Sequence, residues 1–203
     1  MSETVSKREL NRQKRCAAIV QIATRSFFEN GYAATSMSAI ADELGGSKAT
    51  LWSHFSSKEA LFSAVVDAMV QQFSGNIEEV LIGQTFSPPS LRRLCLRFLD
   101  RLMSDHAVRV FRLIISEGER FPEMSEVYWT RGPTKMVEHV TNFFATAFDR
   151  DEAQSLAEIT IAAVVGYRSQ VLVSPNYRPQ GDSERFVDEF IAHLKLPAKR
   201  ASA

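Results

Sequence analysis

Residues 35–62 constrain the fold of this 203-residue chain more than any other part of its sequence. They read TSMSAIADELGGSKATLWSHFSSKEALF. Apolar residues recur at helical spacing on both sides of Gly45 and Gly46, which predicts a short helix, a tight turn, a second short helix and the start of a third. A helix-turn-helix of this kind can place its second helix in the major groove of DNA.

The remainder of the chain also has helical periodicity. Apolar residues three or four apart predict a first amphipathic helix near residues 9–30, ended by Asn30 and Gly31. A long apolar stripe predicts a helix of roughly 25 residues beginning at Lys58. Later helices follow, with one starting at Pro122, an interruption at 132–133, an apolar helix at 151–173, a polar loop at 174–182 and a last helix at 183–195. We therefore predict an all-α protein with an N-terminal three-helix helix-turn-helix domain at residues 1–57 and a larger helical domain at 58–203.

Charge is distributed unevenly although the net charge is zero. Residues 1–58 hold 8 Lys and Arg against 5 Asp and Glu. Five of these basic residues lie close together near the N-terminus: Lys7, Arg8, Arg12, Lys14 and Arg15. A basic arm beside a helix-turn-helix would attract phosphates, whereas a solvated terminus would explain the same composition; the sequence alone leaves both interpretations open.

Membrane and redox signals are weak in this sequence. We find no apolar run that approaches the ~18 residues needed to span a membrane, and the first residues lack the apolar core of a signal peptide. We therefore expect a cytoplasmic protein with no membrane segment. Cys16 and Cys95 lie in apolar helical patterns, which favours buried thiols over a disulfide.

An enzyme is the main alternative from another functional class. The four histidines are dispersed, and we find no HExxH, no GxSxG and no glycine-rich phosphate loop. The glutamates at 117, 119, 123 and 126 lack the Glu-x-x-His pairs of a di-iron bundle. We therefore expect no catalytic site, no metal and no cofactor. A structural or adaptor bundle is the other alternative, and salt-sensitive binding to a palindromic duplex would exclude it.

Two segments resemble a known family. Residues 17 to about 66, including FFENGYAATSMSAIADELG and SKATLWSHFSSKEAL, resemble the TetR family of bacterial transcriptional regulators. Residues 110–133, VFRLIISEGERFPEMSEVYWTRGP, look like the C-terminal domain of its AefR-like subgroup. The resemblance implies a homodimer whose N-terminal helices bind a palindromic operator in double-stranded DNA, and whose residues 58–203 bind a small-molecule inducer and dimerise. In this family, inducer binding usually changes the separation of the DNA-binding heads and releases the operator.

The resemblance also implies which side chains contact DNA. Lys48 and Thr50 are the best candidates for base edges, because lysine can reach a guanine and threonine can touch a thymine methyl. Trp52 stands where the family usually has tyrosine, and its indole N–H can donate to a phosphate or the ring can instead pack on the first helix. The remaining candidates offer hydroxyls, helix-end amides or cationic groups to phosphates: Thr35, Ser36, Ser47, His54 and Lys58. Outside this motif, Ser47 would be a helix cap, His54 a surface residue and Lys58 a solvated first-turn lysine.

Three positions around the turn depart from the common family pattern. Gly46 replaces a small apolar residue, Leu44 stands where alanine is frequent, and Ala49 replaces a frequent glycine. Alanine should stiffen the second helix slightly. These changes leave the exact pitch of the recognition helix open.

Ligand and dimer contacts are expected in the C-terminal part. Ligand cavities are mostly apolar with a few polar groups, so we expect a hydrophobic or amphipathic inducer near Phe98, Phe111, Ile115, Glu117, Trp129, His139, Tyr167 and Arg168. Most of the aromatic residues could equally be ordinary core. Small residues at 162, 163, 166 and 169 would let another helix approach closely, which predicts a homodimer through residues 151–173 and 183–195, with packing inside one chain as the alternative.

Overall fold

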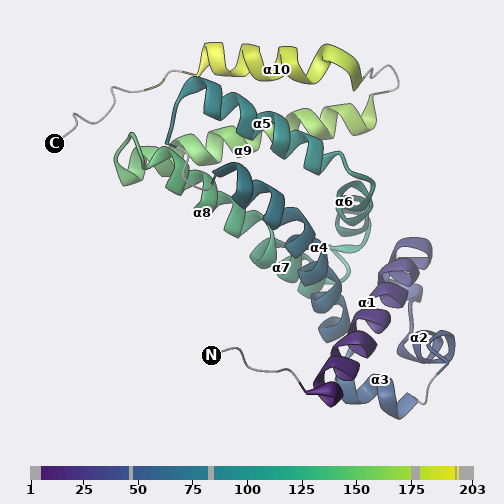
Figure 1. Cartoon of the computed structure of the whole chain (residues 1–203). Helices are drawn as coiled ribbons and strands as arrows, with labels where there is room; N and C mark the ends of the chain where they lie inside the picture. Colours follow the sequence, from purple (N-terminus) through teal and green to yellow (C-terminus); the bar gives the residue numbers. More distant parts are fainter. Residues whose placement is uncertain (1–5, 46–47, 82–84, 175–178, 195, 197–203) are drawn as a thin grey trace. The chain divides into compact units, whose positions relative to one another are not determined.

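The computed structural model describes residues 6–45, 48–81, 85–174, 179–194 and 196. Within these ranges the chain forms ten α-helices and no strand, which confirms the all-α prediction. Figure 1 shows them in chain order. They are α1 (Lys7–Ala34), α2 (Met37–Glu43), α3 (Lys48–His54), α4 (Lys58–Leu81), α5 (Pro88–Leu102), α6 (Asp105–Glu117), α7 (Pro122–Arg131), α8 (Pro133–Phe144), α9 (Arg150–Val173) and α10 (Pro179–His193).

The chain forms two compact units whose boundary differs from the one predicted after residue 57. Unit 1 comprises Met1–Val70 and Arg109–Arg131, and unit 2 comprises Gln71–Val108 and Gly132–Ala203. Most of α6 and all of α7 therefore join the N-terminal helices, although the sequence predicted that they belong to the C-terminal domain. Their apolar side chains explain this difference, because Leu113 and Met124 are buried in the same core as the helix-turn-helix.

Unit 1 is built around aromatic and aliphatic side chains from α1 to α4. Phe27, Tyr32, Leu51 and Leu61 are fully buried there. The ring of Tyr32 stacks on Phe27 at 5.5 Å between centroids and meets the edge of Phe62 at 5.2 Å. Such aromatic pairs add stability beyond the area that they bury. The short helices are thus held by tertiary packing, because seven-residue helices are unstable alone.

Local signals in the sequence set the ends of the helix-turn-helix. Ser36 caps α2, and its hydroxyl accepts a hydrogen bond from the amide of Ala39 at 3.1 Å. After α2, Gly45 has a φ of 67°, the left-handed conformation that glycine adopts without a steric penalty. Gly46 and Ser47 lie outside the described residues, so the predicted cap at Ser47 is not described either.

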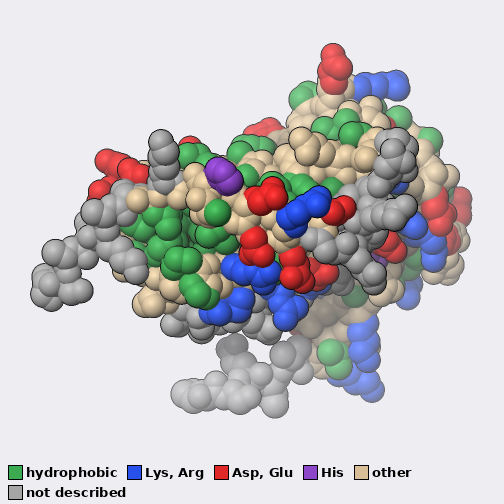
Figure 2. Space-filling view, turned by 90° about the horizontal axis from the view of Figure 1, so that it is seen from above, with side chains coloured by type: hydrophobic (Ala, Val, Ile, Leu, Met, Phe, Trp, Pro, Cys, Tyr) green, Lys and Arg blue, Asp and Glu red, His purple; other side chains and the backbone are tan. Residues whose placement is uncertain are grey.

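Unit 2 is a helical bundle in which α8 packs on α9, and α5 packs on both α9 and α10. Figure 1 shows α5, α9 and α10 running alongside one another. Phe86 lies among Phe143, Phe144 and Phe148, with ring centroids 5.0–5.7 Å apart. Figure 2 shows the molecule from above, and acidic and basic side chains are interleaved on the face seen in that view. The guanidinium of Arg92 on α5 donates to Asp188 at 2.6 Å and to Glu184 at 3.1 Å, and both carboxylates belong to α10.

One helix in unit 2 differs from its sequence prediction. Helix α10 begins at Pro179, inside the segment predicted as a loop at 174–182, and proline is favoured in the first turn of a helix.

Helix α9, Arg150–Val173, lies where the sequence predicts an apolar helix at 151–173. It is long and apolar enough to cross a membrane by length and composition, although Glu158 and Arg168 interrupt its apolar sequence. A single helix of this kind is weak evidence for a membrane segment, and α9 packs on α5 and α8 in the protein core.

Candidate nucleic-acid interface

Helix α3 has one anchored side and one exposed side. Leu51 is fully buried in the core of unit 1, and Phe55, just after the helix, is buried as well. Lys48 is exposed, and Trp52 leaves 50% of its surface open, so its ring is not enclosed by packing. Thr50, which lies between them in the sequence, is half-buried. The arrangement presents a cation and an indole N–H to solvent from a helix whose position is fixed by the core.

The residues flanking α3 differ in how far they reach the surface. Ser36 is exposed at the start of α2, and His54 is half-buried in the last turn of α3. Thr35 is only 3% exposed, and its hydroxyl donates to the carbonyl of Gly31 at 2.8 Å. The Thr35 hydroxyl therefore has a partner inside unit 1, whereas Ser36 and His54 remain accessible.

Lys58, which the sequence predicts to contact a phosphate, also has partners within the protein. The Lys58 side chain is half-buried, and its ammonium donates to the carbonyl oxygens of Tyr32 at 3.0 Å and Thr35 at 3.3 Å. The ammonium also lies 4.4 Å from the centre of the Tyr32 ring and 5.8 Å from that of Phe121, which are cation–π distances. These contacts hold the charge inside unit 1.

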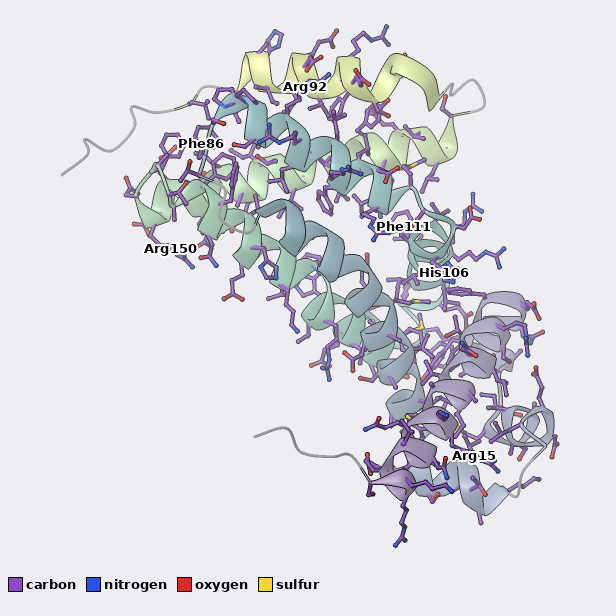
Figure 3. The ribbon with its side chains drawn as sticks, viewed as in Figure 1. Arg15, Phe86, Arg92, His106, Phe111 and Arg150 are labelled. Atoms are coloured by element: carbon purple, nitrogen blue, oxygen red, sulfur yellow. The ribbon has the colours of Figure 1, made fainter. Side chains whose placement is uncertain are left out.

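The basic N-terminal segment is helical from residue 7 onward. Ser6 caps α1 by accepting from the amide of Glu9, and Arg12 forms an ion pair with the same glutamate at 3.1 Å. The other four basic residues are exposed, and those seven positions apart lie on nearly the same side of the helix: Lys7 with Lys14 and Arg8 with Arg15. Figure 3 labels Arg15 on α1. The segment is therefore a charged helix face rather than an extended arm, at least from residue 7.

The eight predicted ligand contacts do not form one group within either unit. Phe111, Ile115, Glu117 and Trp129 belong to unit 1, where Ile115 and Trp129 are 69% and 64% exposed. Figure 3 labels Phe111, which is half-buried on α6. The other four belong to unit 2: Phe98 and Arg168 are buried, and His139 and Tyr167 are half-buried.

The described part of unit 2 does not bring the predicted ligand residues together around a hollow. The ring of Tyr167 stacks on Phe186 at 4.2 Å, so it contributes to helix packing. A surface hollow of about 340 Å³ is lined by Arg93, Leu96, Arg97 and Asp100 on α5, and none of the predicted ligand residues lines it. Within the residues that the structure describes, no three His, Cys, Asp or Glu side chains are grouped as a metal site would require.

The carboxylate of Glu117 binds two backbone amides that the sequence did not predict as its partners. Its Oε1 accepts from the amide of Tyr32 at 2.6 Å, and its Oε2 accepts from the amide of Ala33 at 2.8 Å. Because these partners are 85 and 84 positions away, helical periodicity contains no signal for them. Burial raises the pKa of the nearby Tyr32 phenol above its ordinary range, and the carboxylate of Glu59 raises it further.

Comparison with protein families identifies two regions of similarity. Residues 19–65 match the model described as bacterial regulatory proteins, tetR family. Residues 89–163 match the model described as AefR-like transcriptional repressor, C-terminal domain. The first match covers α2 and α3 completely, and the second extends from α5 into α9.

Individual proteins give the same picture. The chain is 33% identical over 105 residues to the HTH-type transcriptional activator FasR of Mycolicibacterium smegmatis, and this match covers 52% of the chain and 47% of FasR. It is 25% identical over 200 residues to the HTH-type transcriptional regulator TtgR of Pseudomonas putida, covering 93% and 95% of the two chains.

Solved structures show the same fold. A protein from Mesorhizobium loti, described as a TetR-family transcriptional regulator, superposes with a TM-score of 0.75 at 26% identity and covers 89% of this chain and 95% of that one. The Flavonoid-responsive Regulator FrrA superposes with a TM-score of 0.74 at 24% identity, covering 88% and 95%. At this identity the likeness to FrrA shows the fold alone.

Proposed function

We propose that this chain, which belongs to the TetR family of bacterial regulatory proteins, is a repressor that leaves a palindromic operator when a small molecule binds. Members of this family are DNA-binding transcriptional regulators rather than enzymes. Repression is supported by the match of residues 89–163 to a model of transcriptional repressors. A regulator of this kind acts on DNA in the cytoplasm, where we expect this protein.

The observation that carries the proposal is the anchored and exposed α3 within the region that matches the family. Leu51 fixes the helix on the core, and Lys48 and Trp52 are available on its exposed side. Lys48 and Thr50 would read base edges, since these side chain types contact guanine and thymine in the major groove. Trp52, His54 and Ser36 would contact phosphates and so fix the register of the helix on DNA. We also propose Ser47 as a phosphate contact, on the family resemblance alone, because it lies outside the described residues.

Selection of bound duplexes from a random library tests this function. We expect a palindrome with half-sites about one helical turn apart, because a two-fold dimer presents two recognition helices. The affinity should fall steeply as salt is raised from 50 to 200 mM, because phosphate contacts release counterions. Recovery of random sequences with no enrichment would contradict the proposal.

The ligand part of the proposal is a hydrophobic or amphipathic inducer. It is supported by the aromatic side chains of the helical C-terminal part and by the match to an AefR-like domain. We expect such compounds to raise the unfolding temperature and to weaken operator binding, whereas strongly charged metabolites should do neither. Stabilisation by a charged metabolite, with no response to any apolar compound, would overturn this assignment.

A further inference from the structure

Residues 32–35 are the end of α1 after Gly31 together with its C-cap Thr35, and they are held by charged side chains from two other helices. Gly31, with φ 80° and ψ 169°, interrupts α1 just before this segment, and Ser36 caps α2 just after it. Any shift of residues 32–35 would move the start of α2. Helix α2 packs on α3, so the shift would also move α3.

Glu117 holds this segment through its amides. Each carboxylate oxygen accepts one amide hydrogen, from Tyr32 and Ala33 respectively. Hydrogen bonds to an ionised acceptor are shorter and stronger than neutral ones, and two bonds to one planar carboxylate fix the orientation of both amides. The carboxylate also approaches Gly31 so closely that a Cβ there would lie 2.5 Å from Oε1.

Lys58 holds the same segment through its carbonyls. Its ammonium donates to Tyr32 and Thr35, so the cation from α4 and the anion from α6 bind opposite kinds of backbone group on three of these four residues. The Tyr32 ring adds an apolar contact, because it meets the edge of Phe121 at 4.9 Å between centroids. The backbone of residues 32–35 is thus fixed by groups that come from α4, from α6 and from the start of α7.

We propose that Glu117 is a positioning residue for DNA binding, which acts by fixing residues 32–35 and thereby α2 and α3, without contacting DNA itself. The inference rests on the proposed DNA-binding function. It also gives residues 109–131 a role in operator binding, although they lie far from the helix-turn-helix in sequence.

The sign of one substitution separates positioning from simple electrostatics. Glu117→Gln removes a negative charge from a protein that binds a polyanion, so electrostatics alone predicts equal or tighter binding. Positioning predicts weaker binding, because the amide group of glutamine provides only one acceptor oxygen for the two backbone amides. Glu119→Gln is the matched control, since Glu119 is exposed two residues away and loses the same charge.

The experiment measures the affinity of the full-length protein for its selected operator between 50 and 200 mM salt, at a temperature where each variant is folded. We expect Glu117→Gln to bind about tenfold more weakly, which corresponds to about 1.4 kcal/mol, while Glu119→Gln binds at least as tightly as the original protein. Glu117→Asp serves if the glutamine variant does not fold, since its shorter side chain keeps the charge and should still bind more weakly.

Amide hydrogen exchange of the protein without DNA gives an independent readout. We expect Glu117→Gln to increase exchange across residues 32–54 and to leave α8 and α9 unchanged. If the original protein binds no duplex, the proposed function fails, and exchange still reports whether Glu117 fixes the helix-turn-helix. Unchanged exchange at residues 32–54, or operator binding by Glu117→Gln as tight as that of the control, would overturn the inference.

Discussion

Leu51 makes the buried contact of α3, so alanine at the exposed Lys48 or at the half-buried Thr50 leaves that contact in place. We expect Lys48→Ala and Thr50→Ala each to weaken operator binding by about 1–3 kcal/mol if they read bases. A mobility-shift titration against the selected operator and against duplexes altered one base pair at a time would measure this. Lys135→Ala, an exposed lysine on α8, is the control and should bind normally. Unchanged affinity in both α3 variants would remove them from the base-reading assignment.

Gly31 and Gly45 both have positive φ, but their surroundings differ. The ψ of 169° at Gly31 places it in a region accessible almost only to glycine, and Glu117 fills the space beside it. No atom lies within 4 Å of a Cβ built at Gly45, so only the left-handed backbone is costly there. We therefore expect Gly31→Ala to lower the free energy of unfolding by about 3 kcal/mol and Gly45→Ala by about 1 kcal/mol. Urea denaturation measures both, and equal losses would contradict the role of Glu117 beside Gly31.

At the scale of helices, α10 is attached to α5 partly by charge. The hydrogen bonds from Arg92 lower the pKa of Asp188 below its ordinary value. A lowered folded-state pKa stabilises the protein at pH values above the unfolded value of about 3.9, and this contribution disappears as the pH falls through the folded value. Asp188→Asn should therefore destabilise the protein slightly at pH 7 and by less near pH 2. Urea denaturation at the two pH values checks this, and a loss of equal size at both would contradict it.

The positions of most helices could be predicted from local signals. Glycines and serine caps mark α2, and apolar periodicity marks α4 and α9. Contacts between distant residues could not be predicted in this way. Glu117 stands out in the sequence as a polar residue on an apolar helix, which led to its assignment as a ligand contact, but the amides that it binds belong to α1. The same limit applies to the unit boundary, since it depends on where the apolar faces of α6 and α7 are buried.

For the whole molecule, the proposed repressor requires a homodimer through α9 and α10. Gly166 is exposed on α9, and among the residues that the structure describes a Cβ built on it meets no atom within 4 Å outside its own helix backbone, so one chain has room for a larger side chain there. In a dimer built on α9, the same side chain would fill space that the partner occupies. If the dimer forms through this part of α9, Gly166→Leu should weaken it. If these small residues serve only packing inside one chain, Gly166→Leu should leave the oligomeric state unchanged.

We expect the original protein to sediment as a dimer at micromolar concentration and Gly166→Leu to shift it toward monomer. The isolated subunit should keep its helical content, because leucine is a better helix former than glycine. Operator binding should weaken as dimerisation weakens, because a monomer presents only one recognition helix to the two half-sites. Glu138→Leu, at an exposed position on α8 outside the predicted dimer helices, is the control for added apolar surface and should remain dimeric. A dimeric Gly166→Leu with normal operator affinity would place the two-fold axis away from this part of α9, and a monomeric original protein would remove the palindrome from the proposal.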